Sequence, residues 1–373
     1  MKRFLIVFLI FLLIPTAAFG AEEDEYSEYL SSFDLESFEL LDDDTTEFLD
    51  SLGILDFNYE NLTDISIASV FEHIWGIVTK SINGPLKSGI IVIVFILLSS
   101  FFRSLSSEVN NSDISQTFST VSTLIISIFL TYNLTDCIGI CASTIKLCSN
   151  FAFAFFPAFC IIVATSGSTL TSFSVNTTLL ILAQALNYIS ELIFIPVTNC
   201  FLALGICSGV RQELNLSSTI ATLKRIITTS ISTISAIFVS ILSVKTAVAS
   251  RADALGLRSV RFAINSVVPV IGSSISEGLL SIQTYSSLIK TSVGIVGIIA
   301  VVSIFLPSII EINMWRMILS LASISGEIFG DSSSVKAIET FKDVLLIIDV
   351  LLILTMVTTI ISIGILVAAK SVV

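Results

Sequence analysis

The segment that decides the fold is residues 286–310, which read SSLIKTSVGIVGIIAVVSIFLPSII. Its only charged residue is Lys290, near its start. A helix of about 20 apolar residues is long enough to cross the hydrocarbon core of a bilayer. Residues 344–369 form a second run of this kind. Because backbone polar groups inside lipid must be hydrogen-bonded within the segment itself, both runs predict transmembrane helices.

Further apolar runs occur throughout the rest of the body. The clear ones are residues 85–102, 117–134, 149–166, 175–196 and 226–244. Residues 262–280 and 314–329 are interrupted by polar residues, so each is interpreted as a span, a re-entrant hairpin or an interfacial helix. The predicted fold class is all-α: a polytopic helical membrane protein with about seven or eight spans, some broken or re-entrant, behind a small acidic helical front.

The composition supports this class and shows where the charge lies. Of the 373 residues, 54% are apolar and 13% are charged, against about 25% charged in soluble domains. The mean hydropathy of +0.97 excludes a disordered chain and argues against an ordinary soluble enzyme. Residues 21–79 carry 17 Asp or Glu and no Lys or Arg, whereas residues 80–373 carry 16 basic and 13 acidic residues. The net charge of −12 therefore averages an acidic front and a weakly basic membrane domain.

Residues 1–20 have the pattern of a secretory signal peptide. Lys2 and Arg3 precede an apolar run at residues 4–14, and the small residues Ala18 and Gly20 suit a cleavage site. An uncleaved N-terminal anchor is the alternative. Either reading predicts that the acidic segment is extracytoplasmic.

The acidic segment, residues 21–79, combines its charge with apolar residues at helical spacing. A candidate docking face consists of Tyr26, Tyr29, Leu30 and Phe33. A second apolar face consists of Phe48, Leu52 and Leu55. We interpret the segment either as a docking region for a partner or as a solvated spacer. Its negative charge is repelled by nucleic acid, so nucleic-acid binding is excluded.

Prolines and ionisable residues within the apolar runs mark candidate functional positions. Two proline pairs have spacings of 39 and 38 residues, which fits an internal repeat of the kind found in transporters or, alternatively, independent helix kinks. Lys146, Lys290 and Asp349 are interpreted as residues at the membrane interface. Glu191 lies deepest in its run and is the best candidate for an intramembrane role. The candidate polar or hinge residues are Pro157, Glu191, Pro196, Asp253, Pro269, Gly272, Glu277, Lys290, Gly294, Gly297 and Pro307.

The residues needed for common enzyme chemistries are scarce. His73 is the single histidine, the six cysteines include no Cys-x-x-Cys pair, and no Gly-rich phosphate loop ends in Gly-Lys-Ser/Thr. A histidine-based metal site and a Ser-His or Cys-His hydrolase are therefore excluded. We predict no cofactor and no enzyme activity.

Three short stretches resemble a known family. They are Arg251-Ala252-Asp253, the residues VPVIG at 268–272, and the residues SLIKTSVGIVG at 287–297. Together with the signal peptide, the acidic front and the multi-span body, they are similar to the stage III sporulation protein AE family of endospore-forming bacteria. The resemblance covers residues from about 85 to the end and is strongest at residues 245–310.

The resemblance implies a role that the composition does not. Members of this family belong to a channel or feeding-tube complex in the mother-cell membrane that surrounds the forespore, and the complex sustains forespore development. Expected partners are the lipid bilayer, a cytoplasmic ATPase, ring-forming proteins and further copies of the chain itself. The alternative function is a secondary transporter for a small solute.

The orientation of the spans stays open at this point. The two most basic loops, residues 211–225 and 245–261, are separated by one clear span, although basic loops are expected on the cytoplasmic side.

Overall fold

A computed structural model describes most of the membrane body and part of the acidic front. The described residues are 40–52, 67–108, 112–189, 195–196, 198–200, 203, 207, 217–267 and 272–368. They form helices and short turns, and none of them lies in a strand, which confirms the all-α prediction. The helices are α3 (Asp43–Ser51), α5 (Ile67–Ser81), α6 (Asn83–Glu108), α7 (Ser112–Thr165), α8 (Thr169–Ile189), α10 (Ser217–Val267), α11 (Gly272–Ile328) and α12 (Ser332–Ala368).

Five helical stretches among the described residues are long and apolar enough to cross a bilayer, which supports a polytopic membrane protein. They are Glu72–Phe102, Thr120–Thr165, Ala221–Gly256, Ser286–Ile328 and Ser332–Ala368.

The helices are longer than the predicted spans. The predicted spans 117–134 and 149–166 both lie on α7, which continues unbroken for 54 residues. The segment between them contains no proline and one glycine, Gly139, and a single glycine lowers helix stability without ending a helix. Its polar residues therefore lie on a helix surface and do not form a loop between two spans.

Helices α7 and α11 pack antiparallel in one continuous register. Near the upper end of α7, Phe155 lies against Gly297. About three turns lower, the hydroxyls of Thr144 and Ser308 form a hydrogen bond of 2.6 Å. Each step along one helix is matched by a step back along the other, so residues on the two helices can be assigned to the same level.

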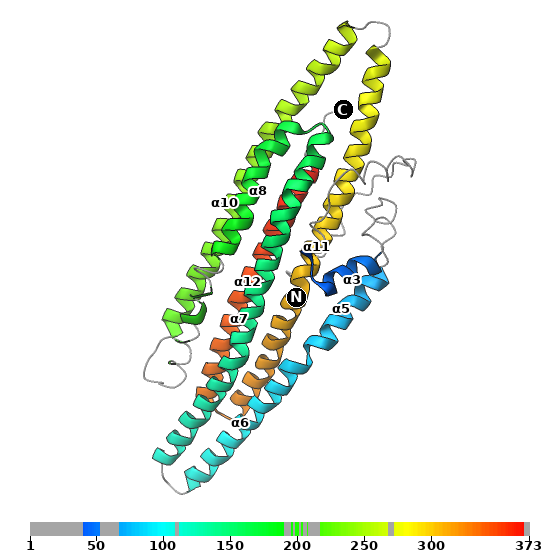
Figure 1. Cartoon of the computed structure of the whole chain (residues 1–373). Coiled ribbons are helices and arrows are strands. Elements are labelled where there is room, and N and C mark those ends of the chain that lie inside the picture. The colour runs from blue at the N-terminus through cyan, green and yellow to red at the C-terminus, as the bar shows by residue number, and fades with distance from the viewer. Residues whose placement is uncertain are drawn as a thin grey trace.

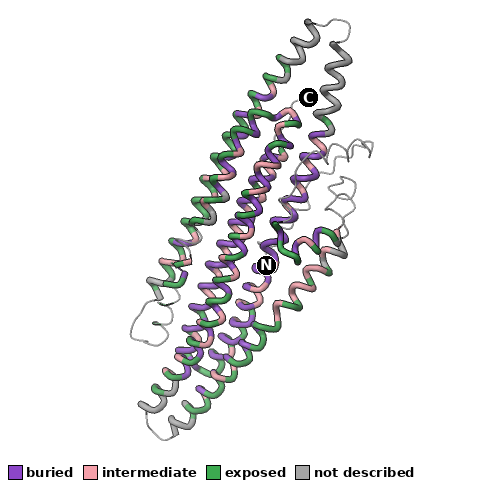
Figure 2. The backbone as a smooth tube through the Cα atoms, in the orientation of Figure 1, coloured by how far each residue is buried: buried purple, intermediate pink, exposed green. Residues whose placement is uncertain are grey.

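Helix α12 runs parallel to α7 with a constant offset. Ser334 bonds Thr123 at 3.4 Å, and Thr359 approaches the thiol of Cys148 at 4.0 Å. Helices α7, α11 and α12 thus form the centre of the bundle, where Figure 2 shows most of the buried residues.

Two helices flank this centre on opposite sides. Helix α6 contacts α7 and α11, whereas α10 contacts α12 and α8 (Figure 1). The short helix α3 and helix α5 pack against α11. Phe48 and Leu49 of α3 are buried, so part of the acidic front is attached to the membrane body.

Gly294 and Gly297, near the start of the predicted long span, allow α11 to pack closely against α7 and α12. A Cβ atom on Gly297 would lie 2.5 Å from Cζ of Phe155, and one on Gly294 would lie 2.2 Å from Cγ2 of Val367. Phe155 cannot retreat easily, because it is fully buried in a stack with Phe151 and Phe159 at centroid distances of 5.2 and 5.1 Å.

We expect Gly297→Ala to destabilise the bundle by about 1–3 kcal/mol, because overpacking a tight core forces side chains off their preferred rotamers. Gly139→Ala on α7 is the matched control: nothing lies within 4 Å of its Cβ position, so the better helix propensity of Ala is gained without a clash. Thermal unfolding of both variants in detergent micelles measures the difference. Equal melting temperatures would contradict the tight contact.

Candidate functional site

A groove of about 810 Å³, lined by both hydroxyl-bearing and apolar side chains, lies between α10 and α12. Helix α12 contributes the apolar residues Leu346 and Val350 to its lining. Helix α10 contributes hydroxyl groups that recur about every four residues, which places them on one face. These hydroxyl residues are Thr228, Thr229, Ser232, Thr233 and Ser240.

Four of the five hydroxyl groups of the groove donate a hydrogen bond to a backbone carbonyl of α10. Thr228 donates to the carbonyl of Lys224 at 3.0 Å, and Ser232 donates to the carbonyl of Thr228 at 2.9 Å. Ser240 donates to the carbonyl of Ala236 in the same way, at 2.7 Å. Each hydroxyl oxygen keeps acceptor capacity, because a hydroxyl has two lone pairs. The groove therefore offers a row of hydroxyl acceptor atoms to a polar solute or to water.

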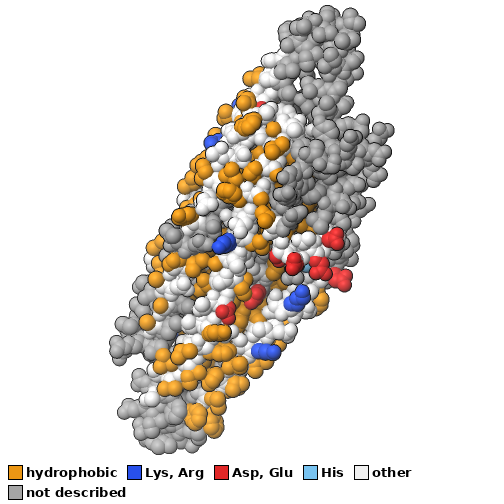
Figure 3. Space-filling view, viewed as in Figure 1, with side chains coloured by type: hydrophobic (Ala, Val, Ile, Leu, Met, Phe, Trp, Pro, Cys, Tyr) orange, Lys and Arg blue, Asp and Glu red, His pale blue; other side chains and the backbone are white. Residues whose placement is uncertain are grey.

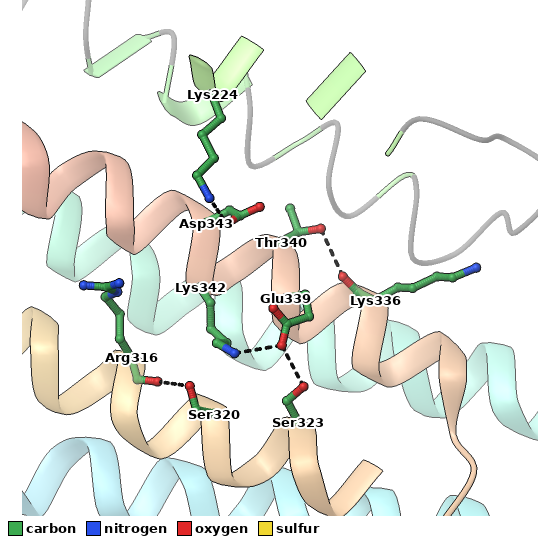
Figure 4. Close-up of polar contacts among 9 residues, drawn as sticks. All are labelled: Lys224, Arg316, Ser320, Ser323, Lys336, Glu339, Thr340, Lys342 and Asp343. Atoms are coloured by element: carbon green, nitrogen blue, oxygen red, sulfur yellow. Dashed lines mark hydrogen bonds and ion pairs between the residues drawn. The ribbon is translucent and has the colours of Figure 1, made fainter. Parts of the chain in front are cut away.

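An ion pair lies at the lower end of this groove. The ammonium group of Lys224 on α10 binds the carboxylate of Asp343 on α12, with about a third of each side chain exposed (Figure 4). The pair joins the two helices whose surfaces line the groove.

A second polar contact joins α12 to α11. The carboxylate of Glu339 accepts hydrogen bonds from the hydroxyl of Ser323 at 2.8 Å and from the ammonium group of Lys342 at 2.7 Å (Figure 4). Half of the Glu339 side chain is exposed, so this contact contributes little to stability. Together with Asp343, these residues place three charged side chains within two turns of α12.

A more deeply buried ion pair lies about two turns farther along α12. Asp349 is 7% exposed, and its two carboxylate oxygens accept from Arg316 at 3.0 Å and from Asn313 at 3.1 Å. The guanidinium group of Arg316 also donates to the side-chain oxygen of Asn313 at 3.2 Å. The interpretation of Asp349 as an exposed interfacial residue therefore needs correction: it is buried against α11.

The sequence reading missed the α11 partners of Asp349. Residues 314–329 are open to three interpretations in the sequence, and Arg316 is the only basic residue among them. The available signal was the spacing of Asn313 and Arg316, because residues three apart share a helix face.

The predicted candidate Asp253 has a defined structural role. Its carboxylate accepts from the backbone N–H groups of Leu170 at 2.7 Å and Thr171 at 2.9 Å, and from the hydroxyl of Thr171 at 2.7 Å. These groups lie at the N-terminus of α8, where backbone N–H groups lack helical partners and the helix dipole favours an anion. Asp253 on α10 thus caps a helix that precedes it by more than 80 residues.

Lys290 is buried and does not reach the surface. It is 3% exposed and lies four and seven residues before Gly294 and Gly297, on the face of α11 that meets α7. The interfacial interpretation of Lys290 is thus wrong for its side chain. Lys146, by contrast, is exposed on α7, as that interpretation expects.

The remaining candidates do not join the groove. Pro157 and Pro307 are half-buried within α7 and α11, Pro196 is exposed, and Gly272 and Glu277 lie in the first turns of α11. Outside the described residues are Glu191, Pro269, Tyr26, Tyr29, Leu30, Phe33 and Leu55. The intramembrane role of Glu191, the proline repeat and the docking face all stay predictions.

The histidine and most of the cysteines have structural surroundings. His73 stacks on Phe48 with ring centroids 3.8 Å apart, which fastens α3 to α5. The cysteines of α7 are buried side chains of the core. Across the described part of the chain, no cluster of His, Cys, Asp or Glu could hold a metal ion.

Long apolar helices, tight glycine contacts and paired charges between helices define a polytopic α-helical membrane protein. The chain belongs to the stage III sporulation protein AE family, whose sequence model matches residues 53–370. It is similar to the stage III sporulation protein AE of Bacillus subtilis (strain 168), with 21% identity over 241 residues. That alignment covers 65% of this chain and 60% of the relative. No solved structure matches the chain. Family membership implies a role in sporulation.

Proposed function

We propose that this protein is a membrane channel or scaffold subunit of the sporulation transport complex that links mother cell and forespore and is needed for forespore development. It resides in the mother-cell membrane around the forespore, with its acidic front extracytoplasmic. The observation that carries this proposal is the row of hydroxyl groups in the groove between α10 and α12, with the Lys224–Asp343 ion pair at its lower end.

A groove of this kind is unexpected in a protein that only anchors others to a membrane. Ionisable residues on apolar helices are costly, and they mark solute or ion pathways where they face a water-filled cavity. A row of oxygen acceptors can replace part of the hydration shell of a polar solute. The groove lies open along one side of the bundle, so a neighbouring chain is needed to close it into a passage.

The partners follow from the family and from the acidic front. The family resemblance implies a cytoplasmic ATPase and ring-forming proteins as partners, and an ATPase partner fits a chain that lacks a phosphate-binding loop of its own. Packing of Phe48 and Leu49 against the body attaches the middle of the acidic segment to the bundle. The predicted docking face at residues 26–33 then lies within about 20 residues of this attachment point, close enough to hold a partner domain beside the membrane body.

The groove is tested by filling it. We expect Ser240→Trp to lower the yield of heat-resistant spores by at least about tenfold, because an indole ring would block the acceptor-lined surface. Ser243→Trp is the matched control, since Ser243 is exposed on the same helix but does not line the groove. Both variants are compared at equal protein level and equal co-purification with the complex. Normal sporulation of Ser240→Trp would remove the groove from the function.

The same groove is also compatible with a stand-alone secondary transporter. Purified protein in liposomes separates the two functions: a transporter moves a solute without partners and loses this activity in Glu191→Gln, whereas a complex subunit shows no uptake alone.

A further inference from the structure

The outward face of α7 changes from apolar to polar and back to apolar along its length. Near the lower end, its large exposed side chains are apolar and include Ile125 and Ile128, the latter 70% exposed. Near the upper end, Phe153 and Ile161 are exposed at 51% and 59%. Between these two apolar stretches the exposed residues are small or polar, namely Thr135, Asp136, Gly139, Ser143, Lys146 and Asn150.

The polarity changes with position along the helix axis, and the change does not come from a switch from one face of the helix to another. Ile125, Ser143 and Ile161 are spaced 18 residues apart, which is five full turns, so all three point in the same direction. A surface that is apolar, then polar, then apolar along one line cannot be explained by one side of the helix facing the core. We call the level of residues 135–150 the waist.

The ion pair between the other two central helices lies at the same level. The register set by Thr144 and Ser308 places Arg316 of α11 level with Asp136. The offset set by Cys148 and Thr359 places Asp349 of α12 within the waist as well. The ion pair between Arg316 and Asp349 is thus part of it.

The acidic front meets the bundle at the waist too. A cavity of about 260 Å³ is lined by Thr45 of α3, His73 of α5, and Ser303 and Pro307 of α11. By the register of Thr144 and Ser308, the last two lie level with residues 149 and 145 of α7, within the waist. In Figure 3 most acidic side chains of the visible face gather midway along the molecule, with apolar surface toward both ends.

The length of the helix excludes a single continuous hydrocarbon environment. Ile125 and Ile161 are separated by about 54 Å at 1.5 Å per residue, whereas the hydrocarbon core of a bilayer is about 30 Å thick. We propose that the waist is exposed to water on the side of the membrane that holds the acidic front, and that α7 contributes two separate apolar segments instead of one long span. The waist then includes the part of this subunit that soluble domains of partner chains can reach.

Single-cysteine labelling tests the proposal in the full-length chain with its six native cysteines replaced. A membrane-impermeant maleimide is applied from the side of the membrane on which Asp50→Cys is labelled, because Asp50 is an exposed residue of α3. We expect Ser143→Cys to react about as fast as Asp50→Cys. Ile125→Cys and Ile161→Cys should react at least about 100-fold more slowly, because a thiol in apolar surroundings does not form the reactive thiolate.

The three positions on one face of α7 serve as controls for one another, and labelling after denaturation shows that each thiol is present. Lys146→Cys provides a second waist position if Ser143→Cys does not assemble. Slow labelling of both waist positions alongside fast labelling of Asp50→Cys would overturn the proposal. Labelling of the waist only from the opposite side would overturn its placement with the acidic front. Loss of spore formation in these variants would bear on the proposed function and not on the waist.

Discussion

Asp349→Leu is expected to destabilise the protein by about 3 kcal/mol, because it leaves the guanidinium group of Arg316 partly buried without its counter-charge. Asp349 is 9% exposed at the side chain and Arg316 is 29% exposed, so solvent compensates only part of the loss. The free energy of unfolding in mixed micelles measures this cost. The effect should exceed that of Asp343→Asn, which removes an ion pair whose two side chains are about a third exposed.

The double variant Asp349→Leu/Arg316→Met separates the ion pair from simple packing. Removing both charges leaves no unpaired group, and apolar replacements of a buried pair are often neutral or stabilising. We therefore expect the double variant to recover most of the stability lost in Asp349→Leu. If it is less stable than the single variant, the loss comes from packing, and the electrostatic explanation is wrong.

Asp253→Ala is expected to have the second large effect, a loss of about 2–4 kcal/mol. The substitution leaves two backbone N–H groups and one hydroxyl at the start of α8 without their acceptor, and hydrogen bonds to a charged group contribute about 1.5–3 kcal/mol each before compensation. Asp253 is 5% exposed, so water cannot readily replace the carboxylate. Hydrogen exchange at the amides of Leu170 and Thr171 is a local readout, and both should lose protection.

Two further variants define the cause of this effect. Asp253→Asn keeps one acceptor oxygen and should lose less stability than Asp253→Ala, while Arg251→Ala, two residues away and exposed, should change stability by less than about 0.5 kcal/mol. Equal losses in Asp253→Asn and Asp253→Ala would show that charge, and not hydrogen bonding alone, holds α8 in place.

The sequence predicted which segments are helical and apolar, but it divided them differently from the structure. Residues 135–148 of α7 contain the charged residues Asp136 and Lys146 and lie outside both predicted spans, yet they continue the helix. Asp136 and Lys146 are exposed on the outward face, so they leave the buried face of the helix uninterrupted. The backbone has no strong breaker there, since Gly139 is isolated and Pro157 lies within the helix two turns beyond the segment.

The candidate site was predictable only in part. Asp253 was selected from a three-residue motif, but its partner groups are backbone N–H groups, which no residue type in the sequence reveals. The hydroxyls of α10 were present as a run of Ser and Thr, but their role in a groove depends on the neighbouring surface of α12. Arg316 and Asp349 are 33 residues apart on different helices, so their pairing is a product of the antiparallel packing of α11 and α12.

By itself, the sequence determined that this protein lies in a lipid bilayer and that it is helical. It also determined that an acidic front is separate from a weakly basic body. These properties follow from local quantities: apolar run length, backbone hydrogen bonding in lipid and charge per segment. Only the tertiary structure decided which polar residues meet, that Lys290 and Asp349 are buried, and that polar side chains of several helices share one level. Those features depend on helix register, which arises from contacts such as Gly297 with Phe155 between residues far apart in the chain.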